Sequence, residues 1–416
     1  MAIYLGNTKV SGSGVQVDSS FSDTSTRPVQ NKVITDALET VGYDTWQKPA
    51  DWIDMRNGAL PNSVYFLVAH SADYATYPTF VVKATISNSG TYDVFVDGVK
   101  KATTASATET SLSWQTLALT SGFDVTYPAA LRTHIIRVTP TVSTNTITAI
   151  NTGSISNKGI LWAHFTTKNY IGLSYFAQSN ANPNASTQAP VWEAVTSVGN
   201  ELNVSNLRFA FNCTPSIAYI PAFVAESNQN TTNCELFCSK TSVKHIKLVN
   251  VSYTGYMMFR NVYNVEKIEL ENCAFGTDNS YLFSSCSSLK RLPNIDFSTG
   301  ENYSYALAGV RSLEDTFLDF SANTAVKNIG AYGTSTNPCL GIKGLTVSSS
   351  APFNGSGTQI DIRYTGLDRA ALVTLFNSLP TVTGSQICNI TGATGAADLT
   401  AEDLAIATSR GWTITR

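Results

Sequence analysis

The stretch YMMFRNVYNVEKIELENCAF, residues 256–275, decides the fold, because its spacing of apolar residues recurs along the chain. Phe259 is followed by Val265 and then by Ile268. The first members of successive units lie 26, 22, 24 and 24 residues apart. Such a period is typical of a repeat architecture, in which units stack and share one continuous core. The other units are Phe211/Ile217/Ile220, Phe237/Val243/Ile246, Phe283/Leu289/Leu292 and, in shortened form, Leu307/Leu313.

Within a unit, the alternation of Ile268 and Leu270 with polar residues has a period of two and predicts a short strand. Three segments resemble irregular leucine-rich repeats of the BspA-like type, which occur in bacterial surface proteins and phage tail proteins. The resemblance implies a leucine-rich-repeat solenoid over residues 206–416, although Phe, Val or Ile often replaces Leu. The segments are CELFCSKTSVKHIKLVN at 234–250, YMMFRNVYNVEKIELENCAF at 256–275 and YLFSSCSSLKRLPNIDF at 281–297.

The N-terminal segment, residues 1–45, is rich in Ser, Gly, Thr and Asp and lacks the apolar residues for a core of its own. From Pro28 to Gly42 the spacing predicts a short amphipathic helix, which is marginal in water unless its apolar stripe finds a partner. That partner is either the same helix in other copies of the chain or the chain's own next domain. The stripe includes Val29, Val33, Ile34 and Leu38.

The segment DSSFSDTSTRPVQNKVITDALE, residues 18–39, resembles a segment near the start of phage tail and head fibre proteins. In those proteins it lies between a virion-attaching N-terminus and the distal domains. The resemblance implies virion attachment through the N-terminus and a homo-oligomer, most simply a homotrimer.

Composition limits the possible partners of the chain. Charged residues make up 14% of its 416 residues and the formal net charge is −3, so a nucleic-acid partner has little support. No apolar run reaches the roughly 20 residues needed to span a bilayer, which argues against membrane insertion. The first residues lack the charged and apolar regions of a signal peptide. We therefore expect synthesis in a host bacterial cytoplasm.

Residues 46–150 alternate with a period of two, in short runs separated by turn residues such as Asp97-Gly98. Short strands at this spacing predict an antiparallel β-sandwich of about 100 residues. The predicted strands are Val64–Val68, Phe80–Ser87, Thr91–Asp97, Trp114–Leu119 and His134–Thr139.

Residues 151–205 are interpreted as a connecting and capping region, because a solenoid needs its open apolar end covered. Strand-like pieces at Ile160–Thr166 and Tyr170–Phe176 precede a Ser/Asn/Pro/Ala-rich segment at 178–190, which predicts an exposed loop. The whole chain is thus expected to be multidomain and mainly β with some α.

The C-terminal end regularises into alternating strands and helices. The predicted strands are Gln359–Arg363, Gln386–Ile390 and Trp412–Ile414, and the first predicted helix is Asp368–Leu379. Thr400–Asp403 opens a second helix with a capping box, and Gly411 closes it. This β-α-β-α-β ending resembles the terminal cap of phage repeat domains.

The sequence contains few residues arranged for chemistry. It has no nucleophile elbow, phosphate-binding loop or zinc-protease motif, so we expect neither catalytic residues nor a cofactor. The seven cysteines lie from Cys213 onward and are interpreted as apolar core fillers. Cys234 and Cys238 would supply half of a metal site that no second pair completes, so no metal is expected. Asp93 and Asp97 are expected to be solvated charges beside a turn.

Outward side chains of the repeats are the candidate binding residues, because the flat faces of tyrosine suit sugar or protein contact. Glu269 and Glu271 share the strand face opposite Ile268 and Leu270. That face is either a solvated surface of the solenoid or a glycan-cleaving groove. The candidates are Tyr253, Tyr256, Tyr263, Lys244 and Lys267, with Lys247, Glu269 and Glu271 beside them.

The order of the two resemblances favours a non-enzymatic phage fibre protein of the virion. In this hypothesis a tail fibre presents a repeat domain that binds a glycan or protein of the host surface. One alternative is a capsid head fibre of the same design. The other, from a different class, is a tailspike-like depolymerase that cleaves host polysaccharide.

Overall fold

The computed structural model describes residues 4–5, 8–9, 46–50, 52–71, 79–113, 123–125, 131–152, 159–174, 176–177, 192–207, 210–211, 216–226, 230–231, 242–253, 255–355 and 357–416. In these residues the protein is mainly β with some α, as expected, since α3 (Arg369–Ser378) and α4 (Ala401–Thr408) are their only α-helices. Residues 1–47 and 48–416 form separate compact units. In the first, β1 (Tyr4–Leu5) and β2 (Thr8–Lys9) form an antiparallel pair.

The strands from β3 to β11 pair only in antiparallel fashion with one another in the described residues. We call them the antiparallel region. Burial alternates along β7 and most of β9, whereas β11 is buried throughout and the edge strand β6 is largely exposed. The bounds are β3 (Val64–Ser71), β4 (Thr79–Ile86), β5 (Thr91–Val96), β6 (Val99–Ala105), β7 (Glu109–Ser113), β8 (Phe123–Val125), β9 (Leu131–Pro140), β10 (Ile147–Asn151) and β11 (Ile160–Phe165).

From β12 onward every described strand pair is parallel, and we call this the parallel region. Its first strands are β12 (Ile171–Gly172), β13 (Ala194–Ser197), β14 (Glu201–Asn206), β15 (Ala222–Ala225), β16 (Asn230–Thr231), β17 (His245–Val249), β18 (Ser252–Tyr253) and β19 (Lys267–Glu271). They are followed by β20 (Asn302–Ser304), β21 (Thr316–Phe320), β22 (Asn328–Gly330), β23 (Ile342–Val347), β24 (Ile360–Asp361), β25 (Ile387–Asn389) and β26 (Thr413–Thr415).

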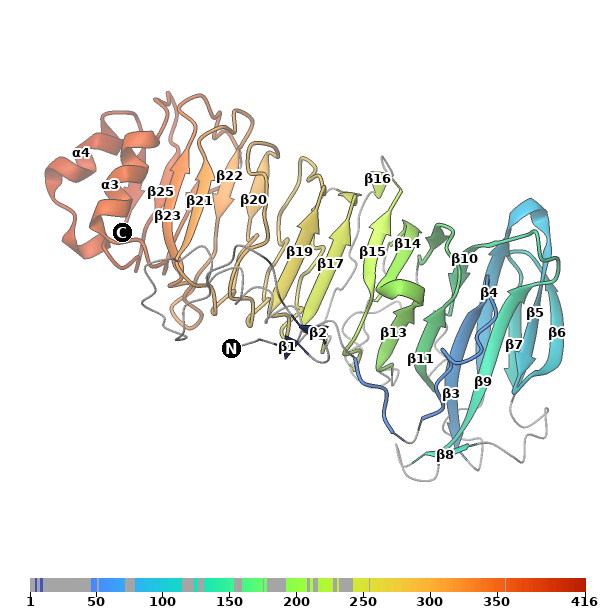
Figure 1. Ribbon diagram of the computed structural model, residues 1–416. Coiled ribbons are helices and arrows are strands. Elements are labelled where there is room, and N and C mark those ends of the chain that lie inside the picture. Colours follow the sequence, from blue (N-terminus) through green and yellow to red (C-terminus); the bar gives the residue numbers. More distant parts are fainter. Residues whose placement is uncertain are drawn as a thin grey trace. The chain divides into compact units, whose positions relative to one another are not determined.

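The two regions share their sheets. The eight-stranded sheet runs β19-β17-β15-β14-β12-β10-β4-β7, so β10 pairs antiparallel with β4 on one side and parallel with β12 on the other. Figure 1 shows β10 beside β4. In the seven-stranded sheet β11 likewise pairs antiparallel with β3 and parallel with β13. Residues 151–205 therefore contribute strands to both sheets, and their apolar side chains belong to the same core as those on either side.

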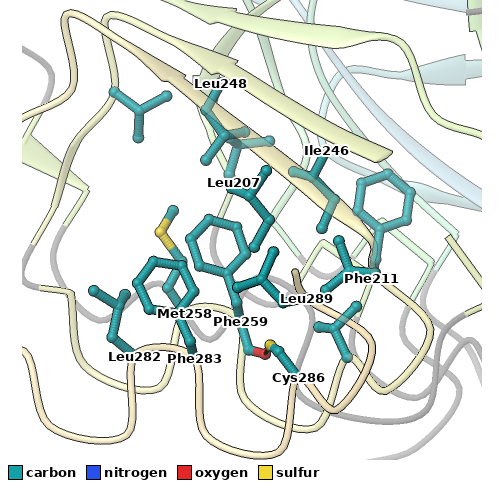
Figure 2. Packing of buried hydrophobic residues seen from close by; sticks show 14 of the residues in the cluster. Leu207, Phe211, Ile246, Leu248, Met258, Phe259, Leu282, Phe283, Cys286 and Leu289 are labelled. Carbon is teal, nitrogen blue, oxygen red and sulfur yellow. Dashed lines mark hydrogen bonds between the residues drawn. The ribbon is translucent and has the colours of Figure 1, made fainter. Parts of the chain in front are cut away.

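The apolar pattern that predicted the repeat is buried in the described residues, except that Leu292 is only partly buried. Phe211, Phe259 and Phe283 are completely buried, and Phe237 lies outside the described residues. The rings of Phe259 and Phe283 stack with centroids 5.3 Å apart and an interplanar angle of 2° (Figure 2). Equivalent residues of successive units thus pack directly on one another, as a shared core requires.

The C-terminal end agrees closely with the sequence prediction. Asp368 caps α3 by accepting a hydrogen bond from the Ala371 amide, and Leu379 is its C-cap. Thr400 and Asp403 form the expected capping box of α4. Strands β24, β25 and β26 flank the helices in the predicted order. Elsewhere, predicted strand 114–119, predicted loop 178–190 and predicted helix 28–42 lie outside the described residues.

Four cysteines lie in the described residues and all are free thiols. Cys286, Cys339 and Cys388 are completely buried in the core, where burial raises the pKa of the Cys388 thiol to about 12 and that of Cys339 to about 11. Cys273 is partly exposed. These positions fit the interpretation of cysteine as an apolar filler. Cys213, Cys234 and Cys238 lie outside the described residues.

Candidate recognition surface

The outward faces of β17 and β19 carry pairs of opposite charges. Parallel pairing places Lys247 opposite Glu269 and His245 opposite Lys267. Lys267 Nζ lies 2.6 Å from Glu269 Oε1, and His245 Nε2 lies 3.4 Å from the same oxygen. Lys247 also pairs with Glu271 at 3.6 Å. The predicted lysines therefore already have carboxylate partners within the chain.

Glu269 is fixed in its ionised form. The hydrogen bond from His245, followed by the one from Lys267, holds the pKa of Glu269 at about 2, although partial burial opposes this shift. A carboxyl group with so low a pKa is a poor general acid at neutral pH. Lys244, whose side chain is 63% exposed, pairs with Glu266 at 3.2 Å. The charges on this face are therefore paired with one another, which fits a solvent-exposed surface better than a glycan-cleaving groove.

The structure brings the two candidate lysines together but supplies the tyrosines from other segments. The Lys267 amide donates to the Lys244 carbonyl at 3.1 Å, at the start of adjacent strands. Tyr253 ends β18, and its side chain is not described. Tyr256 is half-buried, whereas Tyr263 is 37% exposed in the turn before β19. Tyr263 is therefore the described candidate with an available aromatic ring.

The predicted oligomerising residues, Val29, Val33, Ile34 and Leu38, lie outside the described residues. Their proposed role remains a prediction.

An aromatic stack that the sequence analysis missed lies on the turns of the parallel region. The rings of Tyr281 and Tyr305 are stacked, with centroids 4.8 Å apart and an interplanar angle of 4°. The guanidinium carbon of Arg260 lies over the ring of Tyr281, 5.0 Å from its centroid. Both tyrosines have φ of 58°, and Met257, one unit earlier, has φ of 55°. Left-handed backbone is uncommon for non-glycine residues, so these turns are constrained by the stacking of units.

A groove beside β21 was also missed. It is lined by residues 291–298 and by residues from 314 to 322, with a volume of about 880 Å³. Phe317 is 72% exposed in this lining, while its strand neighbours Leu318 and Phe320 are buried. Asp296 and Asp319 line the groove as well. The signal in the sequence was the alternation of Phe317 and Asp319 with Leu318 and Phe320, which is that of a half-buried strand.

Of the two carboxylates expected to be solvated beside a turn, Asp93 differs from the expectation and Asp97 does not. Asp93 is buried, where it pairs with Lys100 Nζ at 2.8 Å and accepts a hydrogen bond from Thr103 at 2.6 Å. The prediction of a solvated charge is therefore wrong for Asp93, because the neighbouring strand β6 covers it. Asp97 is exposed and its Oδ2 lies 2.6 Å from Nδ1 of the buried His134.

His164 and Thr196 form a hydroxyl–imidazole pair inside the protein. His164 Nδ1 lies 2.9 Å from Thr196 Oγ1, which also accepts a hydrogen bond from Trp162 Nε1 at 2.8 Å. Burial lowers the pKa of His164 to about 4, so the ring is neutral at pH 7. Both residues are buried, and neither belongs to the lining of the groove beside β21. The pair is a satisfied polar contact of the core.

Among the described residues, no group of three or more His, Cys, Asp or Glu side chains is placed to hold a metal ion. In the same part of the chain, no helix is long and apolar enough to cross a membrane. Comparison of the chain with protein-family models, curated proteins and solved structures finds no match.

Proposed function

We propose that this protein is a structural fibre of a bacteriophage virion whose repeat region binds a glycan or protein of the host surface. In this proposal the antiparallel region is a β-sandwich and the parallel region a leucine-rich-repeat-like solenoid. The observation that carries the proposal is the ligand-sized groove with the exposed Phe317. Exposed aromatic rings beside polar groups are typical of recognition surfaces.

The buried repeat pattern and parallel strand pairing support the solenoid part of this proposal. The resemblance of residues 18–39 to a fibre segment supports virion attachment and homotrimer formation. A free adhesin needs a binding region such as the solenoid, but it needs no virion-attachment segment such as residues 18–39. Their presence in one chain is the reason for favouring a virion protein.

Two of the four carboxylates in the groove, Asp296 and Asp319, favour binding over hydrolysis. Hydrogen bonds from Ser298 hold the pKa of Asp296 below its usual value, and hydrogen bonds from Ser321 and Thr346 do the same for Asp319. A glycosidase needs one carboxyl group that stays protonated to act as the acid. A tailspike-like depolymerase is therefore the less favoured alternative.

Immunogold labelling of virions with antibodies against the full-length protein tests the proposal. We expect label at the tail tip, whereas label over the capsid would favour a head fibre. Virions of a phage lacking the gene provide the control. Particles without specific label would overturn the virion assignment. Light scattering of the full-length protein should show a trimer.

A further inference from the structure

The groove lies where the strand ladder is interrupted. By the repeat spacing, segment 291–298 stands where a strand between β19 and β21 is expected, and the Lys290 carbonyl just before it accepts a hydrogen bond from the Glu314 amide at 2.9 Å. The segment contains Pro293, which has no amide hydrogen to donate. Among the described strands, β21 pairs with β23 alone. The volume of about 880 Å³ lies within the range of roughly 300–1,000 Å³ found for small-molecule sites. The interruption thus leaves space for a ligand beside an ordered strand.

Phe317 forms a flat platform in this groove. Strand register places it opposite Gly344 of β23. A Cβ atom added at Gly344 would lie 2.4 Å from Phe317 Cδ1, so the ring rests against the glycine backbone. A side chain at position 344 would lift or turn the ring. The arrangement places the ring against the backbone of the neighbouring strand while leaving Phe317 72% exposed.

Hydrogen bonds orient two carboxylates near this platform. Asp296 Oδ1 accepts from the Ser298 amide at 2.9 Å, and Asp319 Oδ1 accepts from the Ser321 amide at 2.9 Å. Thr346 Oγ1 donates to Asp319 Oδ1 at 2.7 Å. These partners are neutral groups, in contrast to the cations that pair with carboxylates on β17 and β19. Ionised carboxylates are strong acceptors for hydroxyl groups.

The charges of the groove limit the class of ligand. Asp296, Glu314, Asp315 and Asp319 line it together with Arg291, so carboxylates outnumber the cation. This balance repels acidic sugars. The lining residues contain no group placed to hold a metal ion. A neutral ligand that donates several hydrogen bonds and has one apolar face fits these features.

We infer that the groove binds a neutral glycan, with one sugar ring stacked on Phe317 and its hydroxyl groups donating to Asp296 and Asp319. The C–H bonds on one face of a pyranose ring carry a weak positive charge, which suits the negative face of an aromatic ring. This inference rests on the proposed function and names the class of receptor for its repeat region.

An array of neutral, amine-bearing and acidic oligosaccharides tests the inference with the full-length protein. We expect binding to neutral glycans, and Phe317→Ala should weaken it by about tenfold or more, since stacking on one aromatic ring is lost. Phe317→Tyr should retain binding because it keeps the platform. Tyr170→Ala, which removes an exposed aromatic ring outside the groove lining, is the matched control and should bind as the parent does. Equal melting temperatures would confirm that all variants fold.

Asp319→Asn tests the role of charge. It keeps one acceptor oxygen but removes the negative charge, so acidic glycans should bind more strongly to this variant than to the parent. Binding restricted to amine-bearing or acidic glycans, or unaffected by Phe317→Ala, would overturn the inference. So would failure to bind any glycan on the array.

The proposed virion function is judged separately, by the immunogold experiment. If virions are labelled but the groove binds no glycan, the fibre assignment is supported and the glycan inference is refuted. Glycan binding through Phe317 without virion labelling would support the glycan inference and refute the fibre assignment. Loss of host-cell adsorption in Phe317→Ala without glycan binding would identify a protein ligand and reject the glycan class.

Discussion

The antiparallel and parallel regions use glycine for different purposes. At the β5–β6 turn, Gly98 has φ of 81° and an added Cβ would meet nothing within 4 Å. In the parallel region, a Cβ on Gly341 would lie 1.8 Å from the Leu313 carbonyl oxygen. The first glycine supplies a backbone conformation, and the second allows two successive coils to approach. Stacked coils are therefore constrained by their neighbours, whereas a hairpin is constrained mainly by its own turn.

The contrast ends at the junction, where one set of aromatic side chains connects both regions. Phe176 lies 6.3 Å from Phe66 of β3, 5.2 Å from Trp192 and 6.2 Å from Phe211, measured between ring centroids. It is completely buried. Because the sheets also continue through the junction, we expect the two regions to unfold together.

Phe176→Ala should produce the largest loss of stability, about 3–5 kcal/mol, because it leaves a cavity between the regions. Chemical denaturation followed by tryptophan fluorescence and by circular dichroism measures the effect. Coincident transitions would indicate a single cooperative unit.

Phe176→Leu is the control, since it keeps most of the apolar volume and should cost clearly less. Two separate transitions in the parent protein would contradict the idea of joint unfolding. Separation only in Phe176→Ala would show that this ring couples the regions.

Sequence patterns predicted those features that depend on local spacing. The period of Phe259 and Phe283 anticipated their stacked burial, and Thr400 with Asp403 anticipated a helix cap. Strand register was not used in the prediction, so the ion pairs across β17 and β19 were missed. Yet Lys247 and Glu271, like His245 and Glu269, are 24 residues apart, one repeat unit, which contained the necessary signal.

The groove was harder to predict from the sequence. An isolated Phe317 is expected to be buried, because Phe is among the apolar residues most often found inside proteins. Its exposure follows from the register of β21, which turns Leu318 and Phe320 inward, and from the interruption at Pro293. Neither the neighbour across the sheet, Gly344, nor the missing strand is near it in sequence. The binding prediction therefore fell on Tyr253, Tyr256 and Tyr263 in the preceding units.

Glycine substitutions should sharpen the comparison between the regions. Gly341→Ala forces a methyl group against the Leu313 backbone and should cost about 3 kcal/mol, at the upper end of overpacking effects. Gly98→Ala has open space around it and should cost about 1 kcal/mol, from backbone strain alone. Thermal unfolding of both variants measures the difference. Equal costs would mean that the close approach of coils is not a major constraint.

Titratable groups of the two regions should lower the stability of the protein in different pH windows. His164 binds a proton only below about pH 4 in the folded protein, against 6.5 for an ordinary histidine. The unfolded chain therefore holds more protons between these values, and stability falls as the pH drops from 6.5 to 4, by up to about 3 kcal/mol. Glu269, with a pKa of about 2 against 4.5, loses its contribution as the pH falls from 4.5 to 2. Because its side chain is partly exposed, that loss should be about 1 kcal/mol or less.

Calorimetry of His164→Gln and Glu269→Gln across these pH values separates the two contributions. Each substitution should flatten the pH dependence of the melting temperature in its own window. A His164→Gln curve parallel to that of the parent between pH 4 and 6.5 would contradict the assignment.

The smallest effect is expected at the end of the parallel region, where helices replace short turns. Thr400 Oγ1 accepts a hydrogen bond from the Asp403 amide, and Asp403 Oδ2 accepts one from the Thr400 amide. Arg369 of α3 also pairs with Asp403 at 2.8 Å, which links the two helices. Thr400→Ala removes one cap and should cost about 1 kcal/mol. Thr400→Ser keeps the hydroxyl and should cost less.

Hydrogen exchange at the Asp403 amide is the decisive measurement. Faster exchange there in Thr400→Ala, with exchange in β3 to β11 unchanged, would locate the loss of stability in the last helix. Equal acceleration in the antiparallel region would instead show that the cooperative unit extends to α4.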